Sequence, residues 1–229
     1  AYVLGKDYLN GEKTVMAVLE LFYNSSDSIS TEKTWHDFWL SLACDVKGIM
    51  VYSYRQSKLS YFGPNLNPNL DTLHHAVGIF KANKLGKVLL QGVEDCTVSD
   101  SIGIQSGPTK TVPFYYQPWN NAFASPPLIE YNSIKLLTKK WQGNTYIFAV
   151  NSTDSTVKFD FKFDTEIPIA TPPSFSAQEL ITNSNQNIQF ISFSGSYWGK
   201  IIHTLPAYGA AVFKYNSSHT LDLSIRDCA

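Results

Sequence analysis

Two uninterrupted apolar strands with an amphipathic helix between them constrain the fold of this chain most strongly. Residues 13–22 (KTVMAVLELF) and 48–54 (GIMVYSY) show little alternation of polar and apolar side chains. Strands of this kind are typical of a parallel sheet that is covered on both faces. Because parallel neighbours need a long crossover connection, this part of the chain predicts an α/β unit rather than a hairpin.

Helical periodicity describes the segments between and after these strands. Residues 31–45 place apolar side chains at helical spacing, with Thr31 as the expected N-cap and acidic Glu32 in the first turn. The apolar face consists of Trp35, Phe38, Trp39, Leu42 and Ala43. A second helix is expected over residues 69–85, with Gly86 as its C-cap. The order strand, helix, strand, helix predicts a βαβα unit, and the sequence supplies no further parallel strand for it.

From about residue 97 the sequence changes to short runs of β-branched and aromatic residues separated by turn signals. Residues 134–141 and 145–151 flank residues 142–144 (QGN), which predicts a hairpin. Residues 156–163 alternate strictly, and their apolar face consists of Val157, Phe159, Phe161 and Phe163. This pattern is typical of an antiparallel β-sandwich. We therefore predict an α/β part followed by an all-β part.

Composition excludes several classes of partner. The net charge is −1 and only 16% of residues are charged, so neither nucleic acid nor an anionic membrane surface is indicated. No apolar run is long enough to span a bilayer. The sequence contains no glycine-rich nucleotide motif, and we expect no cofactor. His74 and His75 lack further ligands at metal-binding spacing, so we expect them on a helix surface and no metal site, and we expect His36 to be exposed.

Glycosylation motifs and cysteines indicate a secreted or extracellular protein, with a lysosomal or cell-surface location as further options. Three N-x-[ST] motifs, at Asn24, Asn151 and Asn216, follow the ends of expected strands. Cys96 and Cys228 lie in polar, non-periodic sequence, and we predict a disulfide between them. Cys44 lies on an apolar helix face and is expected to be a buried thiol, either free or paired with another chain.

The order of elements resembles the C-terminal part of a secreted (β/α)8-barrel glycoside hydrolase with an appended β-sandwich. Residues 13–22 resemble the seventh barrel strand, and VKGIMVYSY resembles the eighth. IKLLTKKWQGNTYIFAVNST resembles the hairpin that opens the core of the sandwich, and LPAYGAAVFKY the strand that closes it. The resemblance implies the last two βα units of a TIM-type barrel in residues 1–95 and an antiparallel β-sandwich in residues 96–229.

The resemblance also implies a role for Glu20. In retaining enzymes of this clan the nucleophile stands at the C-terminal end of the seventh strand, which is the position of Glu20. The acid/base follows the fourth strand, and no residue of this chain matches it. Retention needs two carboxyl groups about 5–5.5 Å apart, so O-glycosidic hydrolysis would need the other barrel strands, from a preceding segment or a second chain. The alternative is that Glu20 forms an ion pair with Lys or Arg, or points to solvent.

Aromatic residues at the ends of the same strands are the candidates for carbohydrate binding. Tyr52, Tyr54 and Arg55 end the eighth strand, which often supplies an aromatic floor under the sugar, and Tyr23 follows the seventh. Tyr52 and Tyr54 share a face, so both point inward or neither does. Packing in the core is the alternative for these tyrosines.

Two other functions remain open from the sequence. The chain is alternatively a non-catalytic secreted glycoprotein with a structural, assembly or carbohydrate-binding role, because the acid/base is missing and a glycan at Asn24 would crowd the mouth of the barrel. A third alternative is a self-contained α+β protein in which the two parallel strands pair with the sandwich.

Overall fold

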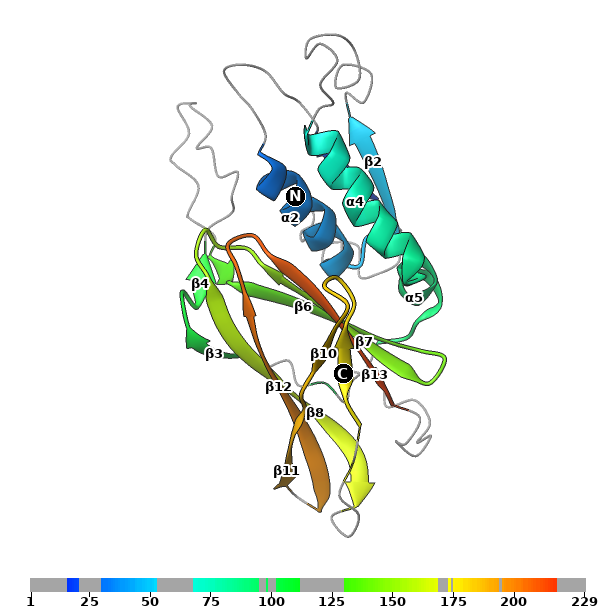
Figure 1. The fold of residues 1–229 in the computed structure, drawn as a ribbon, viewed down its shortest axis with the longest axis vertical. Helices are drawn as coiled ribbons and strands as arrows, with labels where there is room; N and C mark the ends of the chain where they lie inside the picture. The colour runs from blue at the N-terminus through cyan, green and yellow to red at the C-terminus, as the bar shows by residue number, and fades with distance from the viewer. Residues whose placement is uncertain are drawn as a thin grey trace.

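The computed structural model describes residues 16–20, 30–52, 68–94, 98, 102–111, 130–168, 173, 175–193 and 195–217. These residues form a small α/β layer on one side of a two-sheet antiparallel β-sandwich (Figure 1). The predicted sequence of an α/β part followed by an all-β part is therefore confirmed.

The α/β layer has the predicted βαβα order. Strands β1 (Met16–Glu20) and β2 (Gly48–Tyr52) pair in parallel and are connected through helix α2 (Thr31–Ala43). Helices α4 (Pro68–Ala82) and α5 (Leu85–Gln91) follow. Within the described residues β1 and β2 pair only with each other, which contradicts the third alternative, in which they pair with the sandwich.

Two helix boundaries differ from those expected. The N-cap of α2 is Ser30 rather than Thr31, because the Ser30 side chain accepts a hydrogen bond from the Lys33 backbone N–H at 3.2 Å. The helix expected over residues 69–85 ends earlier, at Ala82, and a second helix that was not expected begins at Leu85. Lys84 adopts a left-handed conformation, with φ of 56°, between α4 and α5, so Gly86 lies inside α5 and is not a C-cap.

Two antiparallel sheets form the sandwich. The five-stranded sheet has the order β10-β9-β13-β7-β6, and the four-stranded sheet has the order β11-β12-β8-β3. The strands are β3 (Gly103–Ser106), β6 (Ile134–Trp141), β7 (Asn144–Asn151), β8 (Val157–Pro168), β9 (Ala177–Glu179), β10 (Ser184–Gln186), β11 (Gln189–Phe193), β12 (Ser196–Leu205) and β13 (Ala210–Asn216). Strands β4 (Lys110–Thr111) and β5 (Tyr131–Asn132) form a separate pair.

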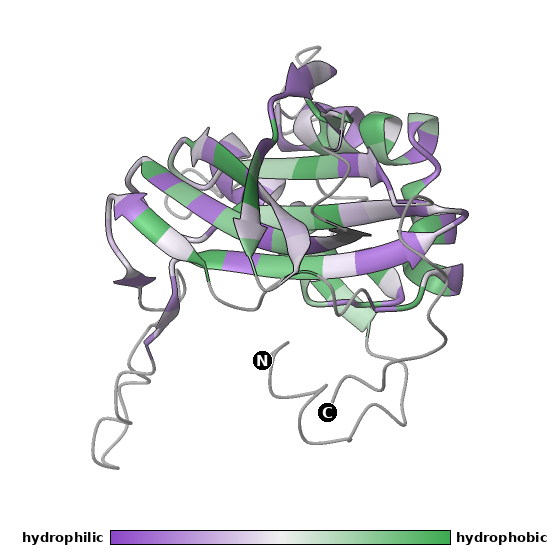
Figure 2. Ribbon diagram, turned by 90° about the horizontal axis from the view of Figure 1, so that it is seen from below, coloured by the Kyte–Doolittle hydropathy of each residue, from purple (hydrophilic) through white to green (hydrophobic). Residues whose placement is uncertain are grey.

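The β6–β7 hairpin and the face of β8 follow the sequence pattern. Gln142 and Gly143 both have positive φ, 50° and 71°, as a two-residue type I′ turn requires. All four apolar residues predicted to share a face of β8 are fully buried between the sheets. The alternation of hydrophobic and hydrophilic residues along the strands is visible in Figure 2.

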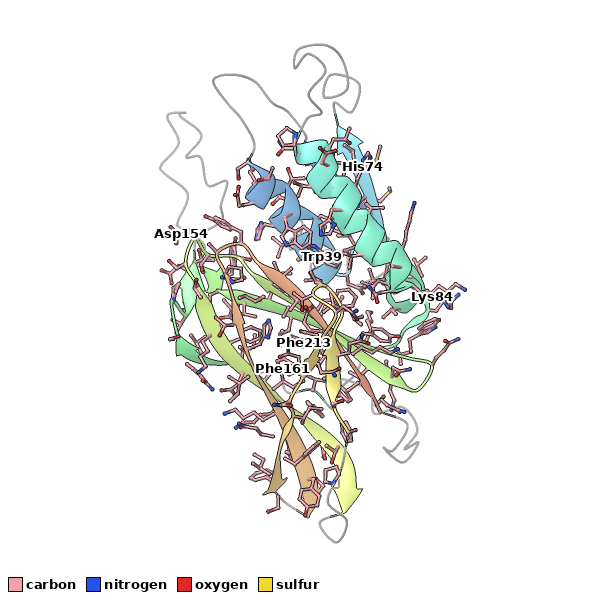
Figure 3. The ribbon with its side chains drawn as sticks, in the orientation of Figure 1. Trp39, His74, Lys84, Asp154, Phe161 and Phe213 are labelled. Carbon is pink, nitrogen blue, oxygen red and sulfur yellow. The ribbon has the colours of Figure 1, made fainter. Side chains whose placement is uncertain are left out.

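Aromatic rings fill the space between the two sheets. The ring centroids of Phe161 and Phe213 lie 5.4 Å apart, and those of Phe163 and Tyr215 lie 4.4 Å apart. Packing explains why residue 199 on the neighbouring strand is a glycine, because a Cβ atom at this position would overlap the Phe163 ring. Figure 3 labels Phe161 and Phe213 in this inter-sheet core.

A second core joins the helices to the outer face of the five-stranded sheet. Side chains of β7 alternate: Phe148 and Val150 pack with the helices, whereas Ile147 and Ala149 pack between the sheets. On the helical side the second core contains Phe38, Trp39, Leu42, Leu70, Leu73 and Ala76. Both predicted parts therefore contribute to one hydrophobic core. The predicted boundary between residues 95 and 96 itself lies outside the described residues.

Candidate functional site

The C-terminal end of the β1–β2 pair brings two of the predicted site residues together. The parallel register makes Glu20 and Tyr52 Cα partners at the last position of the pair. The structure describes the backbone of these two residues but not their side chains. Tyr23, Tyr54 and Arg55 lie outside the described residues, so their roles, like that of Glu20, stay predictions.

The two faces of the β1–β2 pair differ sharply. Ala17 and Leu19 are buried against the helices, with 0% and 3% of their surface exposed. On the other face Met16 and Met50 are 51% and 56% exposed, and Val18 is 46% exposed. Parallel strands are normally covered on both faces, because helices pack on each side or a barrel closes around the inner side. The exposed apolar face is therefore suited to packing against further structure.

A buried histidine connects α2 to the sandwich, and the expectation that His36 is exposed is wrong. The His36 side chain is only 2% exposed. Its Nδ1 lies 3.1 Å from Asp37 Oδ1, and its Nε2 lies 3.3 Å from Ser152 Oγ. The ring also makes an edge contact with Tyr208, with centroids 5.6 Å apart. The sequence gives no signal for this because Ser152 is 116 residues away from His36.

Asp37 contacts His36, and His36 contacts Ser152, which is the order of contacts in the Asp-His-Ser triad of hydrolases. Ser152 is also only 2% exposed, in the seam between α2 and the sandwich. A nucleophilic hydroxyl must contact substrate, and this one is enclosed by protein. The three groups therefore stabilise the seam, and we do not assign them to a reaction.

A second polar cluster links the ends of α2 and α5 to β6. The two carboxylate oxygens of Asp45 lie 2.6 Å from Lys47 Nζ and 3.1 Å from Lys139 Nζ. Lys47 also donates a hydrogen bond to the Leu89 carbonyl at 2.8 Å. Burial alone would raise the pKa of the Asp45 carboxyl. The hydrogen bonds and charges of both lysines outweigh burial and hold this pKa below its ordinary value of 3.8.

Asp45→Asn is expected to lower the free energy of unfolding by about 1.5–3 kcal/mol near pH 7, because it removes charge-assisted bonds to two lysines. The pKa of Asp45 is depressed in the folded chain, so its stabilisation is present above the ordinary pKa and is lost as the pH falls through the folded pKa. Urea unfolding as a function of pH should show the difference between wild type and variant shrinking in acid. The exposed Glu94→Gln is the control, and a difference that persists unchanged in acid would contradict the assignment.

One predicted glycosylation site is wrong. Asn151 is fully buried, and its Nδ2 donates hydrogen bonds to the carbonyl oxygens of Ser155 at 2.8 Å and Pro206 at 2.7 Å. A glycan on this nitrogen has no room in the fold. Asn216 is exposed at the end of β13 and stays a predicted site, whereas Asn24 lies outside the described residues.

The structure describes one of the three cysteines, Cys44. Cys96 and Cys228 lie outside the described residues, so their disulfide stays a prediction. Cys44 is half-buried at the C-cap of α2, rather than buried as expected.

His74 and His75 are exposed on α4 as expected. The described residues contain no group of three or more potential metal ligands among His, Cys, Asp and Glu. None of the described helices is long and apolar enough to cross a membrane.

Comparisons with known proteins find weak similarity to parts of solved enzyme structures. No protein-family model matches the sequence, and no curated protein matches it. An alpha-amylase from Anoxybacillus is similar with a TM-score of 0.38 and 13% identity, over 79% of this chain and 32% of the enzyme. A cyclomaltodextrin glucanotransferase with a three-domain ABC distribution has a TM-score of 0.47 and 8% identity, over 91% of this chain and 38% of the enzyme.

A glycoside hydrolase family 30 subfamily 8 xylanase from Clostridium acetobutylicum has a TM-score of 0.38 and 10% identity, over 90% of this chain and 43% of the enzyme. This chain therefore spans less than half the length of these three structural neighbours. Their names describe enzymes that act on carbohydrate. Because each TM-score is below 0.5, these similarities do not define the fold of this chain.

Proposed function

We propose that this chain forms the last two βα units and the β-sandwich of a glycoside hydrolase-like protein that cleaves O-glycosidic bonds with retention of configuration. The observation that carries the proposal is the parallel β1–β2 pair, which buries one face under helices and exposes apolar side chains on the other. This is the arrangement expected of two barrel strands, whose outer face meets helices and whose inner face meets the side chains of other strands.

Glu20 is the nucleophile in this proposal. The C-terminal ends of barrel strands carry the catalytic groups, and Glu20 is the last residue of β1. Its carboxylate attacks the anomeric carbon while an acid from another strand protonates the departing glycosidic oxygen. The residue that served as the acid then acts as a base. It deprotonates a water molecule, which attacks the anomeric carbon and releases the sugar from Glu20. Tyr52, Tyr54, Arg55 and Tyr23 shape the sugar site beside it.

The remaining strands must come from outside the described residues. Glu20 is the sole carboxylate among the ten residues of β1 and β2, counted from MAVLE and GIMVY. A retaining mechanism needs a second carboxyl about 5–5.5 Å away. We propose that a preceding segment or a second chain supplies the acid/base together with the missing barrel strands.

Native material, isolated with whatever segment or chain accompanies it, provides the test. We expect it to hydrolyse at least one member of a panel of aryl glycosides in both anomeric configurations. Product released first should have the configuration of the substrate, as followed by proton NMR before mutarotation. An inverted product would contradict a nucleophilic role for Glu20.

A non-catalytic, carbohydrate-binding or assembly role in a secreted glycoprotein is the second candidate. The observation that favours it is the single carboxylate in the β1–β2 pair. The exposed position of Asn216 is compatible with a glycan, which secretion would allow. Two results together would favour this candidate: native material hydrolyses no glycoside, and a partner covers the exposed face of its β1–β2 pair.

A further inference from the structure

The outer edges of the two sandwich sheets differ in how well they are protected. An edge strand presents a row of backbone N–H and C=O groups to any further strand, and proteins protect such an edge with charges, proline, bulges or short length. Among the described residues these edges are β6 and β10 of the five-stranded sheet and β3 and β11 of the four-stranded sheet.

Three of the four edges carry such protection. Strand β6 contains three lysines, and an isolated bridge between Val93 and Lys140 lies along it. Strand β10 has only three residues, and β3 has four residues with an irregular register between Ile104 and Ser106. Strand β11 (QFISF) has five residues, a regular register with β12 and no charge, proline or glycine. It is therefore the edge most open to pairing with another strand.

The sequence around β11 is also uncharged. No charged residue occurs between Glu179 and Lys200, a stretch that contains β10, β11 and the first part of β12. Lys200 lies opposite Gln189 at one end of β11, and its Nζ is 3.2 Å from Asp160 Oδ2, so this charge is balanced. The edge strand itself therefore offers a charged partner nothing to pair with, and two copies of it do not repel each other.

The two faces of β11 have different surroundings. The Phe190 ring meets the Phe175 ring at a centroid distance of 5.1 Å, and Phe175 packs against the core between the sheets. Since side chains alternate along a strand, Ile191 and Phe193 lie on the opposite face, where they are 43% and 62% exposed. On β12 only the Trp198 ring is in contact with Phe193, at a centroid distance of 5.8 Å. A strand added beside β11 would place side chains next to both exposed residues.

Strand β11 is complementary to a second copy of itself. Full antiparallel overlap of two Gln189–Phe193 strands is centred on Ile191, which then lies opposite its own counterpart. Phe190 lies opposite Ser192, and Gln189 lies opposite Phe193. Each of these pairs joins residues of the same face, as an antiparallel register requires, and no pair brings like charges together.

We propose that β11 pairs with β11 of a second copy of this chain, antiparallel about a twofold axis at Ile191. The contact joins two four-stranded sheets into one continuous sheet. Because a twofold contact uses the same edge of both copies, assembly ends at the dimer. In Figure 1 β11 lies at the end of the molecule away from β2 and the helices. The contact is therefore remote from Glu20 and does not depend on the proposed function.

Sedimentation equilibrium over a range of concentrations, on native material with whatever segment or chain accompanies it, tests the proposal. We expect a dimer with a Kd of about 10–100 μM, because a contact of five residues on each copy is small. Ile191→Lys should weaken the dimer at least about tenfold, since two ammonium groups then face each other at the axis. Leu90→Lys makes the same change at an exposed position of α5 and is the matched control, which should dimerise as wild type does.

A charge-swap experiment tests the register itself. Ile191→Glu alone should be as monomeric as Ile191→Lys, because both place like charges at the axis. An equimolar mixture of the two variants should associate again, since Ile191 is the position that meets its own counterpart. In wild type, hydrogen exchange of the β11 amides should slow as the protein concentration rises, whereas exchange of the β6 amides should stay constant.

Several results would overturn the proposal. One copy of the chain per particle at every concentration up to about 1 mM would exclude the dimer. A dimer that Ile191→Lys leaves intact would place the contact elsewhere, and a charge-swapped mixture that stays monomeric would reject the antiparallel register. If β11 amides are protected equally at all concentrations in particles with one copy, a strand from another segment or chain covers this edge instead.

Discussion

Replacing Glu20 with Gln is expected to reduce glycoside hydrolysis by native material at least about a thousandfold, because the amide cannot form the covalent glycosyl intermediate. The substitution is nearly isosteric, so the β1–β2 pair should remain intact. Binding of unreactive substrate should weaken far less than turnover falls, since the tyrosines and the other strands still hold the sugar.

The matched control for this experiment is Glu94→Gln, which alters an exposed carboxylate just after α5. We expect this control to keep wild-type activity. Equal activity of Glu20→Gln and wild type, measured on a substrate that native material hydrolyses, would exclude Glu20 as the nucleophile.

The second large effect is expected from Trp39→Ala, which should lower the free energy of unfolding by about 3–5 kcal/mol. Trp39 is 1% exposed on α2 and belongs to the core that α2 and α4 share with β7 and β13. Figure 3 shows the labelled Trp39 where the helices meet the sandwich. In the described part of the chain its Nε1 has no hydrogen-bond partner, so the indole acts through packing.

Urea unfolding followed by far-UV circular dichroism and by tryptophan fluorescence measures this effect. Because both layers share one core, the two signals should shift together in Trp39→Ala. Trp39→Phe keeps an apolar ring and should lose much less stability, and the exposed Leu90→Ala should be near neutral. Two separate transitions, with the sandwich unaffected by Trp39→Ala, would contradict a shared core.

Local pattern was sufficient to predict the sandwich core and the parallel pair. The two-residue period of β8 identified Phe159, Phe161 and Phe163 as a single buried face because strand side chains alternate. The β6–β7 turn followed from Gly143 in a sequence that favours positive φ. The two apolar runs with a helix between them predicted the parallel pairing of β1 and β2, because parallel neighbours are joined by a long crossover connection.

Features that depend on distant segments were missed. His36 looked like a surface residue because its burial arises from contact with Ser152, far away along the chain. Asn151 matched a glycosylation motif, but its side chain holds a turn together through Ser155 and Pro206. The break between α4 and α5 occurs at Lys84, and a lysine gives no sequence signal for a left-handed conformation.

The candidate site was predictable only in part, because no local sequence pattern identifies a second carboxyl group to act with Glu20. The register places Glu20 beside Tyr52, as the order of elements implied. The pairing of the two strands follows from their own sequences, whereas the described residues of β1 and β2 contain no second carboxylate for the proposed mechanism. The role of Glu20 as nucleophile therefore stays a prediction, and the sequence identifies no partner carboxyl for it.

Oxidation of the two methionines tests the central claim most directly, because the chain contains only Met16 and Met50 and both lie on the exposed face of the β1–β2 pair. Dilute peroxide followed by peptide mass spectrometry measures the accessibility of each thioether. If further barrel strands cover this face, both methionines should resist oxidation in native material and should oxidise rapidly in the isolated 229-residue chain. Equal, rapid oxidation in both samples would contradict the claim that this pair is part of a larger barrel.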